Sequence, residues 1–133
     1  MKNLLLIMIL FVSLSAGAQI VRDKSGIKSG EVEQNGTFRD KSGIKSGSID
    51  DNGAVRDRSG IKTGSYENGV FRDKSGIKIG SIDNTGTVRD KSGIKIGSID
   101  NDGAVRDKSG IKIGTAEGIS KERAAAKFFF FEL

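Results

Sequence analysis

Short apolar runs separated by turn signals extend along most of the chain. In Ile94-Lys95-Ile96 two isoleucines alternate with a lysine, and Ala104-Val105-Arg106 is a second run of residues that favour strands. Alternation with a period of two is typical of a half-buried β-strand. Asp-Lys-Ser-Gly and Asp-Asn-Asp-Gly segments between the runs favour type I turns that close on a glycine with positive φ. The pattern predicts a meander of about twelve short strands.

The runs recur because the chain is built from tandem repeats. The string Arg-Asp-Lys-Ser-Gly-Ile-Lys begins at residues 22, 39, 72, 89 and 106, and a copy at 56 has Arg58 in place of its first lysine. Successive copies begin 17 residues apart, except that the third unit is one residue shorter. Five complete units are thus followed by a sixth, partial unit. The middle glycine of each unit, such as Gly97, falls inside a strand and predicts a bulge or a close approach of neighbouring backbones.

Three sets of apolar positions form the candidate core. One set is the isoleucine of each Ser-Gly-Ile-Lys string, which we expect to point inward while the lysine after it points outward. The second set precedes the acidic turn, and the third follows it. Three such side chains are too few to offset the entropy of ordering one unit, so the units must share a core. The sets are Ile27, Ile44, Ile61, Ile77, Ile94 and Ile111; Val32, Ile49, Tyr66, Ile82, Ile99 and Ala116; and Phe38, Val55, Phe71, Val88 and Val105.

Two arrangements share a core among repeats, and the C-terminal segment favours one of them. A closed ring of hairpins has no free edges, whereas an open solenoid needs capped ends. Residues 120–127 predict a short helix with Ser120 as its N-cap. The run Phe128 to Phe131 lacks alternation and predicts a strand covered on both faces. We therefore interpret 120–133 as a segment that closes a radial domain formed by 19–119.

The first 18 residues have the pattern of a secretory signal peptide. Lys2 precedes an apolar run from Leu4 to Leu14, and Ala16-Gly17-Ala18 is a small-residue cleavage site. The apolar run is too short for a comfortable membrane span. We expect an exported mature chain that begins at Gln19, without a transmembrane span, and that is periplasmic, at the cell surface or extracellular.

These features together resemble one known family. The signal peptide ends in Ala-Gln, the units carry Ser-Gly-Ile-Lys-Ile-Gly and Asp-Asn-Asp-Gly-like turns, and an Ala-rich stretch runs into terminal phenylalanines. This combination resembles the secreted five-fold β-flower proteins over essentially all of 19–133. The resemblance implies about five hairpin petals with pseudo-five-fold symmetry, and it implies no established activity. The short third unit departs from the pattern, and its Tyr66-Glu67-Asn68-Gly69-Val70 segment predicts a tight Asn-Gly turn.

Composition removes most catalytic chemistry. The 133 residues include no His, Cys, Trp or Pro, with 22 Lys and Arg against 17 Asp and Glu. A zinc site of ordinary type, a disulfide framework and a nucleophile paired with histidine are therefore excluded. The mild positive charge gives no reason to expect nucleic acid as a partner unless it gathers on one face. We expect no catalytic residues, no cofactor and no metal site.

The remaining candidates are binding residues. The turns Asp50-Asp51-Asn52-Gly53 and Asp100-Asn101-Asp102-Gly103 suggest calcium, but they are too short for a calcium loop and other units lose the pattern. The repeated lysines could instead attract anionic polymers. Tyr66 is the one tyrosine, lies in the shortened unit, and is our single predicted ligand contact.

The sequence thus predicts an all-β chain of 17-residue repeats that forms about five short hairpins in a radial arrangement. The expected function is a non-catalytic secreted or periplasmic structural or binding module. Its ligand is unassigned, and an envelope glycan or a protein is the expected kind of partner. The alternative is a glycan- or calcium-dependent adhesion repeat of solenoid form, and a small hydrolase is a distant third.

Overall fold

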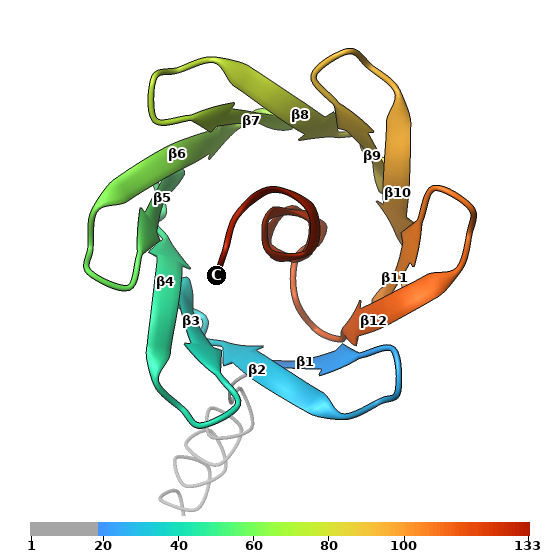
Figure 1. Cartoon of the computed structure of the whole chain (residues 1–133), viewed down its shortest axis with the longest axis horizontal. Helices are drawn as coiled ribbons and strands as arrows, with labels where there is room; N and C mark the ends of the chain where they lie inside the picture. Colours follow the sequence, from blue (N-terminus) through green and yellow to red (C-terminus); the bar gives the residue numbers. More distant parts are fainter. Residues whose placement is uncertain (1–18) are drawn as a thin grey trace, which may run out of the picture.

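Twelve antiparallel strands follow one another around a closed ring in the computed structural model, which describes residues 19–133. Figure 1 shows the ring viewed down its axis, with the C-terminal helix in its centre. The signal peptide predicted for residues 1–18 lies outside the described residues. The strands are β1 (Gln19–Asp23), β2 (Lys28–Val32), β3 (Thr37–Asp40), β4 (Lys45–Ile49), β5 (Ala54–Asp57), β6 (Lys62–Glu67), β7 (Val70–Asp73), β8 (Lys78–Ile82), β9 (Thr87–Asp90), β10 (Lys95–Ile99), β11 (Ala104–Asp107) and β12 (Lys112–Ala116).

The closed all-β arrangement confirms the predicted radial fold, but the ring has six hairpins rather than about five. The sixth unit is not a remnant, because its β11 and β12 form a complete hairpin. Residues Gln19–Asp23 form a further strand, β1, which pairs with β12 through Val21 opposite Ala116. This seam closes the ring, so the open solenoid that the sequence left as an alternative is wrong.

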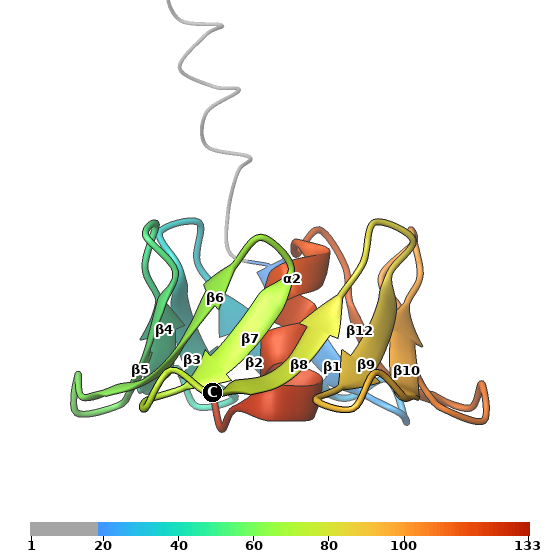
Figure 2. The same cartoon turned by 90° about the horizontal axis from the view of Figure 1, so that it is seen from above.

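The two ends of the ring carry different turns. Because the strands alternate in direction, every connection from an odd to an even strand lies at one end, and every connection from an even to an odd strand lies at the other. We call the first set the tip turns (residues 24–27, 41–44, 58–61, 74–77, 91–94 and 108–111). We call the second set the acidic turns (residues 33–36, 50–53, 68–69, 83–86 and 100–103). Figure 2 shows the tip turns spreading outward at one end of the ring.

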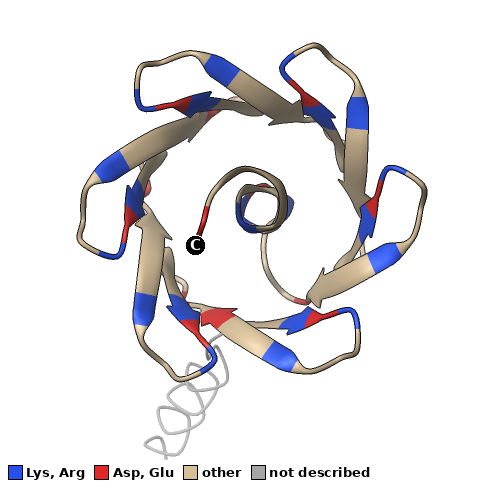
Figure 3. Ribbon diagram, viewed as in Figure 1, with Lys and Arg blue, Asp and Glu red and all other residues tan. Residues whose placement is uncertain are grey.

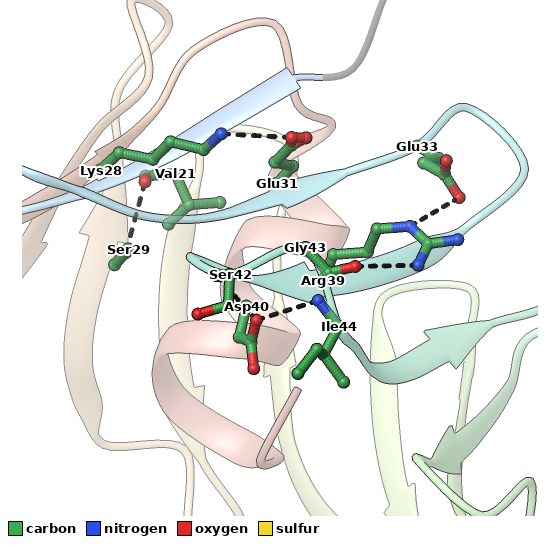
Figure 4. Close-up of polar contacts among 10 residues, drawn as sticks. All are labelled: Val21, Lys28, Ser29, Glu31, Glu33, Arg39, Asp40, Ser42, Gly43 and Ile44. Atoms are coloured by element: carbon green, nitrogen blue, oxygen red, sulfur yellow. Dashed lines mark hydrogen bonds and ion pairs between the residues drawn. The ribbon is translucent and has the colours of Figure 1, made fainter.

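An aspartate holds each tip turn. The Asp40 carboxylate accepts hydrogen bonds from the backbone N–H groups of Ser42 at 2.9 Å and Ile44 at 3.0 Å. The Arg39 guanidinium donates to the Gly43 carbonyl at 3.1 Å (Figure 4). Gly43 has a φ of +86°, as the predicted turn requires. All six tips repeat these contacts, so each is a locally rigid loop.

The tip isoleucines are exposed, contrary to the expectation that they face inward. Ile44 is 59% exposed and Ile27 is 64% exposed, and the other four lie between these values. Each isoleucine belongs to the turn rather than to the strand, and its backbone is held by the aspartate on the outside of the ring. The lysines that follow them are exposed, as predicted. The other two apolar sets are confirmed as core, although Tyr66 is only partly buried.

The centre of the ring is filled by the C-terminal segment. Helix α2 (Lys121–Ala125) begins at Ser120, whose hydroxyl accepts from the Arg123 N–H at 3.2 Å, which confirms the predicted N-cap. It continues as the π-helix η1 (Ala126–Phe130). The strand predicted for Phe128 to Phe131 is therefore wrong, because three of the four phenylalanines are helical and only Phe131 has extended backbone.

Each phenylalanine packs against the middle glycine of a different unit. Phe128 lies over Gly114, and the next three phenylalanines lie over Gly97, Gly80 and Gly64 in turn, followed by Leu133 over Gly47. An α-helix turns about 100° per residue, whereas neighbours in a six-unit ring are about 60° apart. A π-helix has more residues per turn and therefore turns less at each residue. The π-helix therefore brings the angle between consecutive side chains closer to the spacing of the ring, and the extended backbone of Phe131 carries the register on to the next glycine.

The middle glycine also stands beside the predicted bulge. Phe38 pairs with Gly47 and Arg39 with Lys45, so Ser46 is an extra residue in its strand. The same shift occurs at all six tip hairpins. A Cβ at Gly114 would lie 2.6 Å from the Arg22 carbonyl oxygen and 2.7 Å from the Phe128 ring. Both the neighbouring backbone and the aromatic ring therefore require glycine.

We predict that Gly114→Ala destabilises the protein more than Gly30→Ala does. The two glycines have the same contact with a neighbouring carbonyl, at 2.6 Å, but only Gly114 faces a phenylalanine ring. Overpacking of this kind costs about 1–3 kcal/mol. Chemical denaturation of both variants measures the difference in unfolding free energy. Equal losses would show that the phenylalanine contact does not constrain the glycine.

Candidate functional site

Helix α2 is attached to the acidic turns on two sides of the ring. The Arg123 guanidinium donates to the carbonyls of Gln34 at 3.2 Å and Glu33 at 3.4 Å in the turn after β2. Lys121 Nζ donates to Asn101 Oδ1 at 2.7 Å in the turn after β10. Between these two attachments lie the turns after β4, β6 and β8, and two grooves separate them from the helix.

Tyr66 lines both grooves. The first groove, of about 540 Å³, lies between the turns after β4 and β6 and the start of α2. The second, of about 670 Å³, lies between the turns after β6 and β8 and the same helix. Asn68 and Glu122 also line both. The residue predicted as a ligand contact therefore lies where the grooves meet.

The short third unit produces the local geometry around Tyr66. Asn68 has a φ of +50° and Gly69 a φ of +83°, which makes the predicted two-residue turn between Glu67 and Val70. The Tyr66 hydroxyl accepts a hydrogen bond from the Gly69 N–H at 3.1 Å. The tyrosine ring lies 4.9 Å from the Phe71 ring, and Phe71 in turn stacks on Phe130 at 4.6 Å. Tyr66 thus joins the core to the groove surface.

The environment of Tyr66 disfavours its ionised form. Partial burial raises the pKa of the phenol, and the negative charge of Glu122 raises it further, while the hydrogen bond from Gly69 acts in the opposite direction. The phenol therefore stays protonated at neutral pH. Its aromatic face and its hydroxyl are the two groups it offers to a ligand.

The groove walls are rich in hydrogen-bond acceptors. Asp51, Glu67 and Glu122 supply carboxylates, and Asn68 supplies an amide. Such walls suit a ligand that donates several hydrogen bonds, such as a sugar or an amine. Within residues 19–133, no group of three or more His, Cys, Asp or Glu side chains is arranged to hold a metal ion.

The sequence pointed to Tyr66 but not to the helix residues opposite it. Tyr66 interrupts an aliphatic series, which is a signal that repeats make visible. Glu122 and Arg123 lie outside the repeats, so only the closed ring reveals that they face the acidic turns. The turns considered for calcium lie at this end of the ring: Asp50 and Asp100 pair with Arg56 at 3.1 Å and Arg106 at 2.9 Å.

We predict that the pKa of Tyr66 lies above the ordinary tyrosine value of about 10 in the folded protein and returns to it in denaturant. The chain has one tyrosine and no tryptophan, so the ultraviolet absorbance of the phenolate reports Tyr66 alone. Because folding favours the protonated phenol, its contribution to stability declines as the pH rises above the unfolded-state pKa. Glu122→Gln should lower the folded-state pKa, whereas Glu132→Gln, outside the grooves, should not. An ordinary pKa in the folded wild type would contradict the described burial.

Comparison with known proteins gives one match. The family model of the 5-fold beta-flower protein matches residues 18–132, which is nearly the whole of the chain described by the structure. No curated protein and no solved structure matches the chain. The closed ring of glycine-turned hairpins and the extent of the family match agree, and the chain belongs to the 5-fold beta-flower family, here with six hairpins.

Proposed function

We propose that this β-flower protein is an exported, non-catalytic binding module that takes its ligand in the grooves beside Tyr66. The proposal rests on three features that set the third unit apart from the others and that occur together. The lone tyrosine, the shortened turn and the two grooves all occur at the third unit. A purely structural ring has no need for such a departure.

The export part of the proposal rests on the first 18 residues. Their positively charged start, apolar run and small-residue cleavage site are the three parts of a secretory signal. None of the helices within residues 19–133 is long and apolar enough to cross a membrane. We place the mature chain in the periplasm, at the cell surface or outside the cell.

The non-catalytic part rests on the lack of a suitable pair of groups. The chain has no histidine or cysteine, and the groove carboxylates of Asp51 and Glu67 are exposed. A general acid or base at neutral pH is usually tuned by burial or by a close charge. Burial lowers the pKa of Lys127, but its ammonium donates to the Leu133 main-chain oxygen, and Lys127 lines neither groove.

The expected ligand is a molecule with several hydrogen-bond donors and a face that stacks on an aromatic ring. A neutral or amino-substituted glycan of the cell envelope has both properties. The acceptor-rich walls disfavour anionic glycans, because Asp51, Glu67 and Glu122 would repel them. Calcium has no comparable support, since within residues 19–133 no three such carboxylates are arranged to hold a metal ion.

A thermal-shift screen of the purified protein tests this proposal. The probes are neutral, amino and acidic glycans, cell-wall fragments, and calcium with EDTA as its control. A ligand that binds only the folded state at 100 times its Kd adds about 2.7 kcal/mol of stability. We expect an upward shift with neutral or amino glycans, accompanied by a change in tyrosine fluorescence.

A matched variant separates the grooves from the rest of the surface. Tyr66→Ile gives the third unit the side chain that Ile49, Ile82 and Ile99 supply in other units, so the ring should still fold. We expect this variant to lose the ligand-induced shift, while Ile99→Val, at a buried position that lines neither groove, retains it. An equal shift in Tyr66→Ile would place the ligand elsewhere, and a wild-type melt that no probe moves would leave a structural module.

A further inference from the structure

The six exposed isoleucines of the tip turns need a reason other than folding. Among residues 19–133 they are the large hydrophobic side chains that are exposed, each by 59–64%. The tip turn uses only their backbone, since the N–H donates to the aspartate carboxylate and the carbonyl accepts from the aspartate N–H, as at Ile94 and Asp90. A polar residue would make the same turn and avoid exposing an apolar side chain to water.

All six tips keep the isoleucine while neighbouring positions differ. The residue two places later is Ser29, Ser46 or Thr63 in three units and isoleucine in the other three. The acidic turns also differ from unit to unit in length and sequence. Something therefore keeps isoleucine at all six tips that does not act on the neighbouring positions. The described contacts within the ring do not explain it, because they use only the isoleucine backbone.

Charge is strongly divided between the tips and the rest of the ring. The six tip segments (22–28, 39–45, 56–62, 72–78, 89–95 and 106–112) contain 18 Lys or Arg and six Asp, a net charge of +12. The remainder of 19–133 contains three Lys or Arg and eleven Asp or Glu, a net charge of −8. Figure 3 shows the basic residues around the outside of the hairpins. The modest net charge of the chain thus conceals a concentrated basic region.

The tips form one surface because the topology places them at one end of the ring. Every odd-to-even connection lies there, and Figure 2 shows those turns spread around the rim at the end where the chain terminates. Phe130, Phe131 and Leu133 line a groove of about 610 Å³ with Arg58 and Asp57 of one tip. This end therefore combines a basic rim with exposed isoleucines, around a groove lined by partly buried phenylalanines and the exposed Glu132.

We propose that the tip end of the ring docks on the surface of an anionic lipid bilayer. The lysines and arginines would contact lipid phosphates, because basic groups are attracted to an anionic membrane surface. The isoleucines would enter the boundary between headgroups and acyl chains, where apolar side chains are favoured. The acidic turns and the Tyr66 grooves would then face away from the lipid, because their carboxylates are repelled by it.

Isoleucine is the feature that favours lipid over a soluble polyanion. A hydrated polyanion would use the lysines and arginines and leave the isoleucines in water. A bilayer contacts both kinds of side chain at once. Six tips that bind together have a higher overall affinity than one tip, because the first contact raises the effective concentration of the others at the membrane. This surface is separate from the Tyr66 grooves, so the inference does not depend on the proposed ligand.

Vesicle cosedimentation tests the proposal. The protein is purified after export from an expression host, its N-terminus is checked by mass spectrometry, and it is mixed with phosphatidylcholine vesicles with or without phosphatidylglycerol. We expect binding that requires phosphatidylglycerol and weakens as salt is added. Changing all six tip isoleucines to serine should weaken binding at least about tenfold while leaving the melting temperature nearly unchanged, because these side chains are exposed.

Two controls make the outcome decisive. Changing the six tip lysines that follow the isoleucines to glutamine should weaken binding to phosphatidylglycerol vesicles and reduce its dependence on salt. Gln34→Ser, an exposed position on an acidic turn at the opposite end, should leave vesicle binding unchanged. The six lysines are Lys28, Lys45, Lys62, Lys78, Lys95 and Lys112. Failure to bind anionic vesicles would overturn the proposal. So would equal vesicle binding by the isoleucine variant, or heparin binding that matches vesicle binding in both proteins, since a soluble polyanion would then explain the tips.

Discussion

The contact between aromatic rings and bare backbone is the constraint on which the rest of the structure depends. Twelve short strands closed in a ring leave a central space that their own side chains do not fill. Phenylalanines of the C-terminal segment fill it by lying on the strands themselves, where Gly114 and its equivalents present no Cβ. The same glycines let the neighbouring strand approach closely at the bulge. Glycine at these positions thus permits both the close approach of the strands and the packing of the phenylalanine rings on them.

This constraint explains how a regular array of repeats can include one unit that departs from the others. The inner surface is fixed by glycine and by buried valine, isoleucine and phenylalanine, so the change in unit length falls in an acidic turn at one end of the ring. The tip end keeps its sequence in every unit apart from Arg58, while the acidic end varies and loses a residue in the third unit. The two ends are therefore suited to two kinds of contact. The six similar tips suit a broad contact, and the one altered acidic turn suits a local contact.

Much of the fold could be predicted from the sequence because repetition exposes local rules. The glycine turns, the bulges, the helix cap at Ser120 and the Asn68-Gly69 turn all follow from short-range chemistry. The predictions that were wrong concern groups whose place depends on the closed ring. Ile94 alternates with Ile96 like a strand residue, but the turn places it outside. Phe128 to Phe131 lack the polar residues of an amphipathic helix because the ring surrounds them. Tyr66 could be singled out because it interrupts an aliphatic series, but the grooves beside it, with Glu122 and Arg123, depend on where the helix enters the ring.

The seam between β1 and β12 has a consequence for how the chain acquires its structure. The strands that meet there are separated by nearly the whole repeat array, so the ring cannot close until its last strand is available. Contacts of such long sequence separation form slowly, because the loop entropy is lost before the contact is made. A growing chain therefore remains an open series of hairpins with two free edges. Under the export proposed above, the chain would pass the export channel as this open series, and the ring would close only after its last strand has emerged.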